Sequence, residues 1–138
     1  MTTEPPMSTD RCPVLDAGAV IKIARGDRAV RRRLEKARVR GVEMFVPAAV
    51  VAETVRGSGP RDAPVNLVIS STDGVSLLDE ATARRAGRLL GESRSNSIVD
   101  ALVVAEALAR RPCSILTGDP TNLSVLLGAH RGVRIVPI

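Results

Sequence analysis

Short apolar runs with the length of strands alternate along this chain with segments that have the apolar spacing of helices. This order constrains the fold more than any other feature. The predicted strands cover residues 13–15, 44–46, 75–78, 114–116 and 133–136. The predicted helices cover residues 17–24, 27–40, 47–55, 63–70, 80–90, 97–110 and 120–127, with Gly91 separating the fifth from the sixth. The alternation predicts parallel β–α–β units, and therefore an α/β sandwich around a central parallel sheet of about five strands.

The length of 138 residues predicts one domain, over residues 13–138. Residues 1–12 contain Pro5-Pro6 and little to bury, so we expect a flexible tail, whose natural start is either Met1 or Met7. Phe45 is the only aromatic residue, which leaves valine, isoleucine, leucine and alanine to build the core. The chain shows neither a membrane-length apolar run nor a signal pattern, and we expect a cytoplasmic protein with no membrane contact.

The two cysteines, Cys12 and Cys113, are too few and too far apart for a zinc site. Each precedes a predicted strand by one or two residues, so they become neighbours if those strands pair. We expect both to be small, reduced residues at the edge of the core.

The positive charge of the chain is concentrated in one segment. The net charge is +5, from 18 arginines and 2 lysines against 15 acids. Residues 25–40 carry eight basic and two acidic side chains, a local charge of +6. This segment is either a solvated helix face or a surface that contacts phosphates, and the imbalance favours a polyanionic partner such as nucleic acid.

Four acids lie in apolar stretches where charged residues are otherwise scarce: Asp16, Glu53, Asp100 and Asp119. Burying an unpaired carboxylate is costly, so each needs a partner. Asp16 and Asp119 follow predicted parallel strands, whose carboxyl ends form the ligand-binding edge of such a sheet. Hard carboxylate oxygens suit Mg²⁺ or Mn²⁺, which can activate water against a phosphodiester. Thr117 would add a hydroxyl at the same edge.

Each acid also has a purely structural interpretation. Asp16 and Asp119 are suited to cap the helices that follow them. Asp100 stands three residues after Ser97, the spacing of a capping box. Glu53 could face solvent beside Arg56. We interpret His130 as a surface residue.

The order of these motifs resembles that of PIN-domain ribonucleases, and most closely the VapC toxins of bacterial toxin–antitoxin pairs. The motifs are Val14-Leu15-Asp16, then Glu53 in an apolar helix, then Asp100-Ala101-Leu102 and Leu116-Thr117-Gly118-Asp119. The resemblance covers residues 14–138. It implies an α/β/α fold and a Mg²⁺- or Mn²⁺-dependent endoribonuclease that hydrolyses structured RNA such as tRNA or rRNA.

By this resemblance Asp16, Glu53, Asp100, Asp119 and Thr117 are the catalytic residues, and Asp16, Asp100 and Asp119 hold the metal. It also implies a homodimer and a VapB-type antitoxin that covers the active-site groove. The sequence departs from many relatives at Gly18, where a hydroxyl is common, and at Thr121-Asn122, where a further acid is common. The second departure predicts one firmly bound ion rather than two.

Two other functions remain open from the sequence. A non-catalytic RNA- or protein-binding domain could retain the fold with a degenerate site. A phospho-acceptor receiver module is also a parallel α/β domain, but it needs a lysine at the end of a late strand, and Lys22 and Lys36 both lie early. The sequence identifies neither the RNA, nor the cleavage position, nor the antitoxin.

Overall fold

A five-stranded parallel sheet forms the centre of the protein. The structure is a computed structural model that describes residues 12–138. The predicted tail at residues 1–12 therefore lies outside the described residues, except for Cys12. The strands follow the order β3-β2-β1-β4-β5, and every pair is parallel. Their bounds are β1 (Pro13–Leu15), β2 (Phe45–Pro47), β3 (Gly74–Ser76), β4 (Cys113–Thr117) and β5 (Val133–Pro137). The predicted fold class is confirmed.

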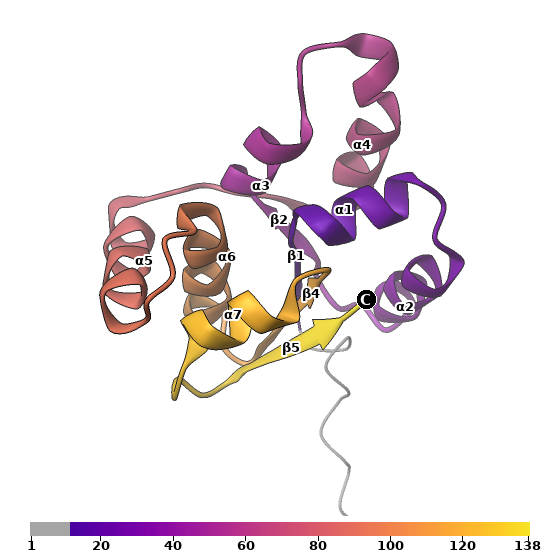
Figure 1. The fold of residues 1–138 in the computed structure, drawn as a ribbon. Helices are drawn as coiled ribbons and strands as arrows, with labels where there is room; N and C mark the ends of the chain where they lie inside the picture. Colours follow the sequence, from indigo (N-terminus) through magenta and orange to yellow (C-terminus); the bar gives the residue numbers. More distant parts are fainter. Residues whose placement is uncertain (1–11) are drawn as a thin grey trace, which may run out of the picture.

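Seven helices connect these strands and cover both faces of the sheet. They are α1 (Ala17–Ala24), α2 (Arg28–Val39), α3 (Ala48–Thr54), α4 (Gly59–Ser71), α5 (Glu80–Glu92), α6 (Ile98–Ala109) and α7 (Pro120–Leu127). Crossovers between parallel strands are right-handed, so the change of direction after β3 moves the later helices to the opposite face. Figure 1 shows α1, α2 and α4 gathered on one side, with α5, α6 and α7 on the other.

The core is aliphatic, as the single aromatic residue requires. β1 and β4 lie at the centre of the sheet, and Val14, Leu15, Ile115 and Leu116 are completely buried. Strands buried on both faces are held firmly in register, here with Leu15 beside Leu116. The two strands therefore place their carboxyl ends side by side, and the residues that follow them start from fixed positions.

The third strand ends at Ser76 rather than at residue 78, and two predicted helix ends are wrong by two residues or more. Gly91 does not end a helix, because α5 continues to Glu92 and the chain breaks only at residues 93–97. The buried side chains of Ala86 and Leu89 dock this helix, and packing outweighs the roughly 1 kcal/mol that a glycine costs in a helix. The predicted helix at 63–70 begins earlier, at Gly59. Pro60 fits its first turn because no backbone N–H is needed there.

No helix within residues 12–138 combines the length and the apolar character that crossing a membrane requires. His130 is exposed, as predicted, and its Nε2 lies 3.0 Å from Glu92 Oε2.

Candidate active site at the carboxyl edge of the sheet

Asp16 is the most firmly held of the predicted site residues. It directly follows β1 and caps α1, with its Oδ1 accepting a hydrogen bond from the backbone N–H of Ala19 at 2.9 Å. Its own backbone N–H donates to the carbonyl of Leu116 at 3.2 Å, which ties it to β4. The side chain of Thr117 and the N–H of Gly118 also hydrogen-bond to the Asp16 carboxyl. The carboxyl therefore has one orientation, set by two central strands.

Burial raises the pKa of Asp16 above its ordinary value. Removal of water from the carboxyl is the largest cause, and the nearby charge of Asp100 raises the pKa further. Hydrogen bonds from Thr117, Ala19 and Gly118 act in the opposite direction but do not offset the burial. The fold thus holds Asp16 where its ionised form is unfavourable.

Glu53 belongs to the same electrostatic group although its side chain is exposed on α3. Its pKa is raised, first by partial loss of solvent and then by the charges of Asp100 and Asp16, while Arg56 lowers it. The interpretation that Glu53 merely faces solvent beside Arg56 is therefore incomplete, because two carboxylates from other elements also act on it.

Asp100 lies in the first turn of α6 and is half-buried. Its Oδ2 accepts a hydrogen bond from the hydroxyl of Ser97 at 2.9 Å and another from the side-chain amide of Asn122. Ser97 makes no capping hydrogen bond, so the predicted capping box is wrong. The serine hydroxyl instead orients the Asp100 carboxylate.

Asp119 stands apart from the other three acids. It is exposed and caps α7, with its Oδ1 accepting from the backbone N–H of Asn122 at 3.4 Å. Its charge is not among the causes that shift the pKa values of Asp16 or Glu53. The structure thus brings three of the four predicted acids together. The fourth, Asp119, is accounted for by its role as the cap of α7.

Thr117 connects Asp119 to Asp16. It is completely buried, its Oγ1 accepts a hydrogen bond from the backbone N–H of Asp119 at 2.8 Å, and its side chain hydrogen-bonds to Asp16. A hydroxyl that both donates and accepts fits this position, which supports the prediction that it belongs to the site.

Neutral residues complete the site, and the sequence did not reveal their roles. Asn122 donates to Asp100, and its Oδ1 accepts from the hydroxyl of Ser95 at 3.2 Å. Asn122 stands where the resemblance led us to expect a further acid, and it supplies an amide that holds Asp100 instead. Gly18 lies against the backbone of Gly118, since a Cβ there would be 3.0 Å from its nitrogen. Because the two backbones lie so close, a hydroxyl-bearing side chain at position 18 has no room unless one of them moves.

The carboxylates fit an open metal site rather than a closed one. Within residues 12–138, no three His, Cys, Asp or Glu side chains come close enough to enclose an ion by themselves. Mg²⁺ rarely needs such an enclosure, because it usually binds one or two carboxylates and completes its shell with water and substrate phosphates. A cation beside Asp16 and Asp100 would relieve the repulsion that raises the pKa of Asp16.

A groove of about 400 Å³ begins at Glu53 and passes between α1, α3 and α4. We call it the arginine groove, because Arg25, Arg56 and Arg61 line it. Arg56 is fixed in place, since one of its terminal nitrogens donates to the carbonyls of Ala52 and Val55, each at 3.0 Å. Guanidinium groups beside a carboxylate site are suited to hold phosphates next to it.

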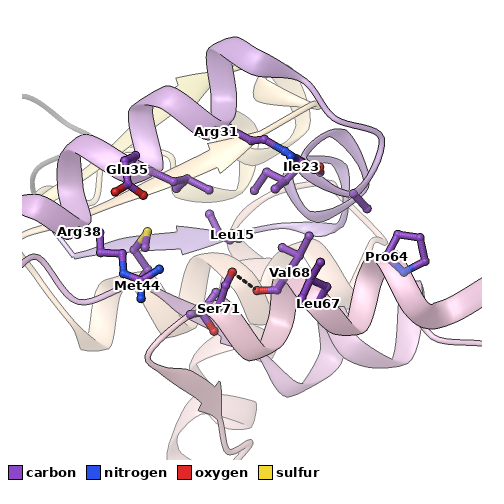
Figure 2. A pocket seen from close by; sticks show the side chains of 13 residues that line it. Leu15, Ile23, Arg31, Glu35, Arg38, Met44, Pro64, Leu67, Val68 and Ser71 are labelled. Carbon is purple, nitrogen blue, oxygen red and sulfur yellow. Dashed lines mark hydrogen bonds between the residues drawn. The ribbon is translucent and has the colours of Figure 1, made fainter.

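A second groove, of about 310 Å³, lies between α1, α2 and α4 (Figure 2). We call it the apolar groove. Its floor is aliphatic, including Leu15, Ile23, Leu34, Met44 and Val68. Charged side chains stand at its margin, where Arg31 donates to the carbonyl of Ile23 at 3.2 and 3.0 Å. Leu67 also lines this groove and is 70% exposed, so its side chain is accessible to a partner.

Comparison with known proteins finds a family model that matches the sequence and solved structures that have a similar fold. The family model described as PIN domain matches residues 14–121. Among curated proteins, none matches the chain in sequence.

Several solved structures have similar folds. VapBC2 from Rickettsia felis bound to a DNA fragment from their promoter has a chain with a TM-score of 0.75 at 11% identity, covering 92% of this chain and 98% of that one. A toxin–antitoxin complex from Klebsiella pneumoniae gives 0.67 at 16% identity, with coverages of 91% and 99%. FitAcB from Neisseria gonorrhoeae gives 0.65 at 14% identity, with coverages of 89% and 95%. At these identities the likeness is one of fold.

Proposed function

Because the chain belongs to the PIN domain family, whose model matches residues 14–121, we propose that it is a Mg²⁺- or Mn²⁺-dependent endoribonuclease and the toxin of a VapBC-type pair. One observation carries this proposal. Asp16, Glu53 and Asp100 come from three different elements, and the charge of Asp100 raises the pKa values of the other two. They lie at the carboxyl edge of a parallel sheet, where such folds bind ligands. Carboxyl groups whose pKa values are raised by burial and by neighbouring carboxylates are typical of catalytic sites.

Asp16 and Asp100 are the side chains that would hold the metal ion. Each is pre-oriented by neutral donors, Asp16 by Thr117 and Asp100 by Ser97 and Asn122. Asp119 is exposed and stands apart from these two, so it would act through water or a second, weaker ion. When bound, the ion would polarise a water molecule and neutralise charge on the phosphate.

The other residues have roles in the hydrolysis itself. Glu53 is accessible to solvent, and its raised pKa suits it to accept a proton from the attacking water. The water oxygen forms a bond to phosphorus, the ester P–O bond breaks, and the leaving oxygen takes up a proton. Arg25, Arg56 and Arg61 would hold phosphates that flank the scissile bond in the arginine groove.

Charge rather than stacking would bind the RNA. α2 carries six basic side chains, and all of them are exposed: Arg28, Arg31, Arg32, Arg33, Lys36 and Arg38. With Phe45 as the only aromatic residue, and half-buried, base stacking has no platform within residues 12–138. Contacts of this kind recognise the backbone and shape of a folded RNA more than its sequence. We therefore propose a structured RNA as the substrate.

The test compares Asp100→Asn with Asp119→Asn on a structured RNA and on DNA, with Mg²⁺ and with EDTA. Asparagine caps a helix as well as aspartate, so Asp119→Asn should fold. At position 100 an amide oxygen can still accept hydrogen bonds from Ser97 and Asn122, so Asp100→Asn should fold as well. Asp100→Asn should lower RNA cleavage by about 100-fold or more, since it removes a charged metal ligand. Asp119→Asn should lower it less, because its carboxylate is not coupled to Asp16 or Glu53. A folded Asp100→Asn protein that cleaves at the wild-type rate would contradict the proposal.

The competing function is a binding domain with a degenerate site, and metal binding separates the two. A cation that binds only the folded protein raises its melting temperature. We expect Mg²⁺ or Mn²⁺ to raise the melting temperature of the wild type and to have little effect on Asp100→Asn. Equal shifts in both proteins would favour the degenerate site.

We also propose that an antitoxin segment occupies the apolar groove. The similar structure from Klebsiella pneumoniae is described as a toxin–antitoxin complex, and the one from Rickettsia felis as VapBC2. In this chain the groove combines an aliphatic floor with a margin of Arg31, Arg38 and Glu35, whose net charge is positive (Figure 2). An amphipathic helix with acidic residues beside its apolar face is complementary to both features.

Leu67→Glu should weaken binding of this partner, encoded in the neighbouring reading frame, without changing RNA cleavage. The matched control is Val125→Glu, which places the same charge at another exposed apolar position, on α7. Equal affinity of both variants for the partner, measured by calorimetry, would place the antitoxin elsewhere. Absence of any such neighbouring gene would favour a nuclease without an antitoxin.

The homodimer that the resemblance implies remains a proposal. Large apolar side chains are exposed at Leu77 (85%), Leu78 (51%) and Ile98 (64%). The two leucines directly follow the carboxyl end of β3, and Ile98 is the first residue of α6. Sedimentation equilibrium of the wild type and of Ile98→Glu tests this. A dimer unaffected by the substitution would assign the interface to another surface.

A further inference from the structure

The two cysteines of the chain meet at the amino edge of the sheet, opposite the carboxylates. Cys12 and Cys113 are 101 positions apart in the sequence, and both are free thiols. Cys12 directly precedes Pro13, and Cys113 directly precedes Ser114, which is the residue paired with Pro13 across β1 and β4. Neighbouring strands are about 4.8 Å apart, which lies within the Cα separation that a disulfide spans.

The contact between the two cysteines is direct. The Sγ of Cys113 donates to the carbonyl oxygen of Cys12 at 2.9 Å, and the two thiols also hydrogen-bond to each other. Cys12 has a φ of 42°, in the left-handed region that few residues other than glycine adopt. The Cys113 thiol is therefore already in contact with Cys12 before any bond joins the two residues.

A fixed cation lies against Cys12. The guanidinium of Arg110 hydrogen-bonds to the Cys12 side chain. Its Nε donates to Glu106 at 2.7 Å, a terminal nitrogen donates to Ser76 at 3.3 Å, and it stacks over the Phe45 ring at 3.8 Å. A guanidinium held from three sides would stabilise negative charge that develops on the Cys12 sulfur.

The two thiols differ in access to solvent. Cys12 is half-buried, whereas Cys113 is 1% exposed. Burial raises the pKa of Cys113, and contact with Cys12 raises it further, so Cys113 remains a protonated thiol at neutral pH. A small oxidant would therefore react at Cys12 first, with Cys113 as the nearest second thiol.

We propose that Cys12 and Cys113 form an oxidisable pair that hydrogen peroxide converts into an intramolecular disulfide. The Cys12 sulfur attacks one peroxide oxygen, the O–O bond breaks, and water leaves after protonation, which yields a sulfenic acid. The Cys113 sulfur then attacks the Cys12 sulfur, the S–O bond breaks, and the hydroxyl leaves as water with the thiol proton of Cys113. Two thiols and one peroxide thus become one disulfide and two waters.

The bridge would join β1 to β4 and close most of the chain into one loop. Long closed loops restrict the unfolded chain most, so oxidation should raise the melting temperature by at least about 5 °C. This inference concerns the amino edge of the sheet and does not depend on the proposed nuclease activity.

The experiment treats the folded, full-length protein with a moderate excess of hydrogen peroxide, alkylates it in urea and digests it without reductant. Trypsin releases Cys12 within residues 12–22 and Cys113 within residues 111–131. We expect these two peptides to be joined, at a mass about 2 Da below the sum of their thiol forms. Dithiothreitol should separate them and reverse the rise in melting temperature.

Cysteine variants provide the controls. In Cys113→Ser, Cys12 should stop at a sulfenic acid that dimedone captures. In Cys12→Ser, the buried Cys113 should remain a thiol. The proposal is overturned if the wild type keeps both thiols, if Cys12 proceeds to sulfinic acid while Cys113 stays reduced, or if the disulfide joins two chains.

Discussion

The ionised form of Asp16 should destabilise the fold, and Asp16→Asn should reveal this through pH. Its pKa is raised above the ordinary value of 3.8, with burial as the largest cause and the charge of Asp100 as a further one. The folded protein therefore holds a proton on Asp16 over a pH range in which the unfolded chain has already lost it. An asparagine resembles the protonated carboxyl and does not titrate.

The sign and the size of the effect follow from proton linkage. Below about pH 3.8 both states are protonated, and the contribution of Asp16 is fully present. As the pH rises from there to the folded-state pKa, the wild type loses about 1.4 kcal/mol of unfolding free energy per pH unit relative to Asp16→Asn. Above the folded-state pKa the difference is constant. A loss of about 1.4 kcal/mol, for one pH unit, corresponds to a change of about 0.5–1 M in the urea midpoint.

The assay is urea unfolding of both proteins from pH 4 to 8, in EDTA so that no divalent ion contributes. Asp62→Asn is the control with the opposite sign. Burial raises the pKa of Asp62, but hydrogen bonds from the backbone N–H groups of Arg56, Gly57 and Ser58 outweigh it and leave the pKa lowered. The wild type should therefore lose stability relative to Asp62→Asn as the pH falls below about 3.8, so this pair is also measured down to about pH 2.5.

A divalent ion should reverse the behaviour of Asp16. With Mg²⁺ bound to the folded state, the carboxylate gains a partner, and the wild type should gain more stability than Asp16→Asn. The reasoning is refuted if the difference between the wild type and Asp16→Asn in EDTA stays flat or increases with pH. A flat difference would mean that the hydrogen bonds from Thr117, Ala19 and Gly118 fully offset the burial.

Three further predictions test local structure. Gly18→Ala should lower the unfolding free energy by about 1–3 kcal/mol, because its Cβ would stand 3.0 Å from the Gly118 nitrogen; an unchanged urea midpoint would mean that this backbone yields freely. Asp119→Ala should cost about 1 kcal/mol through loss of the α7 cap, whereas Asp119→Asn should cost almost nothing; equal losses would contradict a capping role. Leu123→Ala, at a fully buried position, should cost about 2–5 kcal/mol by thermal unfolding, and a smaller loss would indicate that the aliphatic core collapses around the cavity.

The elements that the sequence predicted best have strong local signals. The predicted bounds of α1 and α7 match the structure, because an aspartate caps each of them and Pro120 occupies the first turn of α7. β1 also matches, since its apolar run is buried on both faces. The errors arose at Gly91, where tertiary packing outweighs propensity, and at Gly59, where the Asp62 carboxylate accepts hydrogen bonds from the backbone N–H groups of residues 56–58.

The site was predictable only in part. The position of a residue in the sequence indicates which edge of the sheet it occupies, but not how close its side chain comes to side chains of other elements. Asp16 follows a central strand, so its place was readable from the order of strands. That Asp100 and Glu53 act on it depends on how α6 and α3 pack at the edge. The arginine groove joins side chains from three helices, and Asn122 reaches Asp100 across 22 positions. No pattern along the chain encodes either contact.

The direction of a pKa shift distinguishes acids whose ionised form stabilises the fold from acids whose ionised form destabilises it. Asp79 and Asp16 both cap helices, through hydrogen bonds of 2.8 Å from Thr82 and 2.9 Å from Ala19. The hydrogen bonds of Thr82 lower the pKa of Asp79, so its charge stabilises the fold and capping explains it fully. Asp16 caps equally well, yet its pKa is raised, so its charge is held at a cost that a neutral cap would avoid. Glu53 caps nothing, and its pKa is raised as well. Stability alone gives no reason for these two carboxylates, whereas a site that binds a cation does.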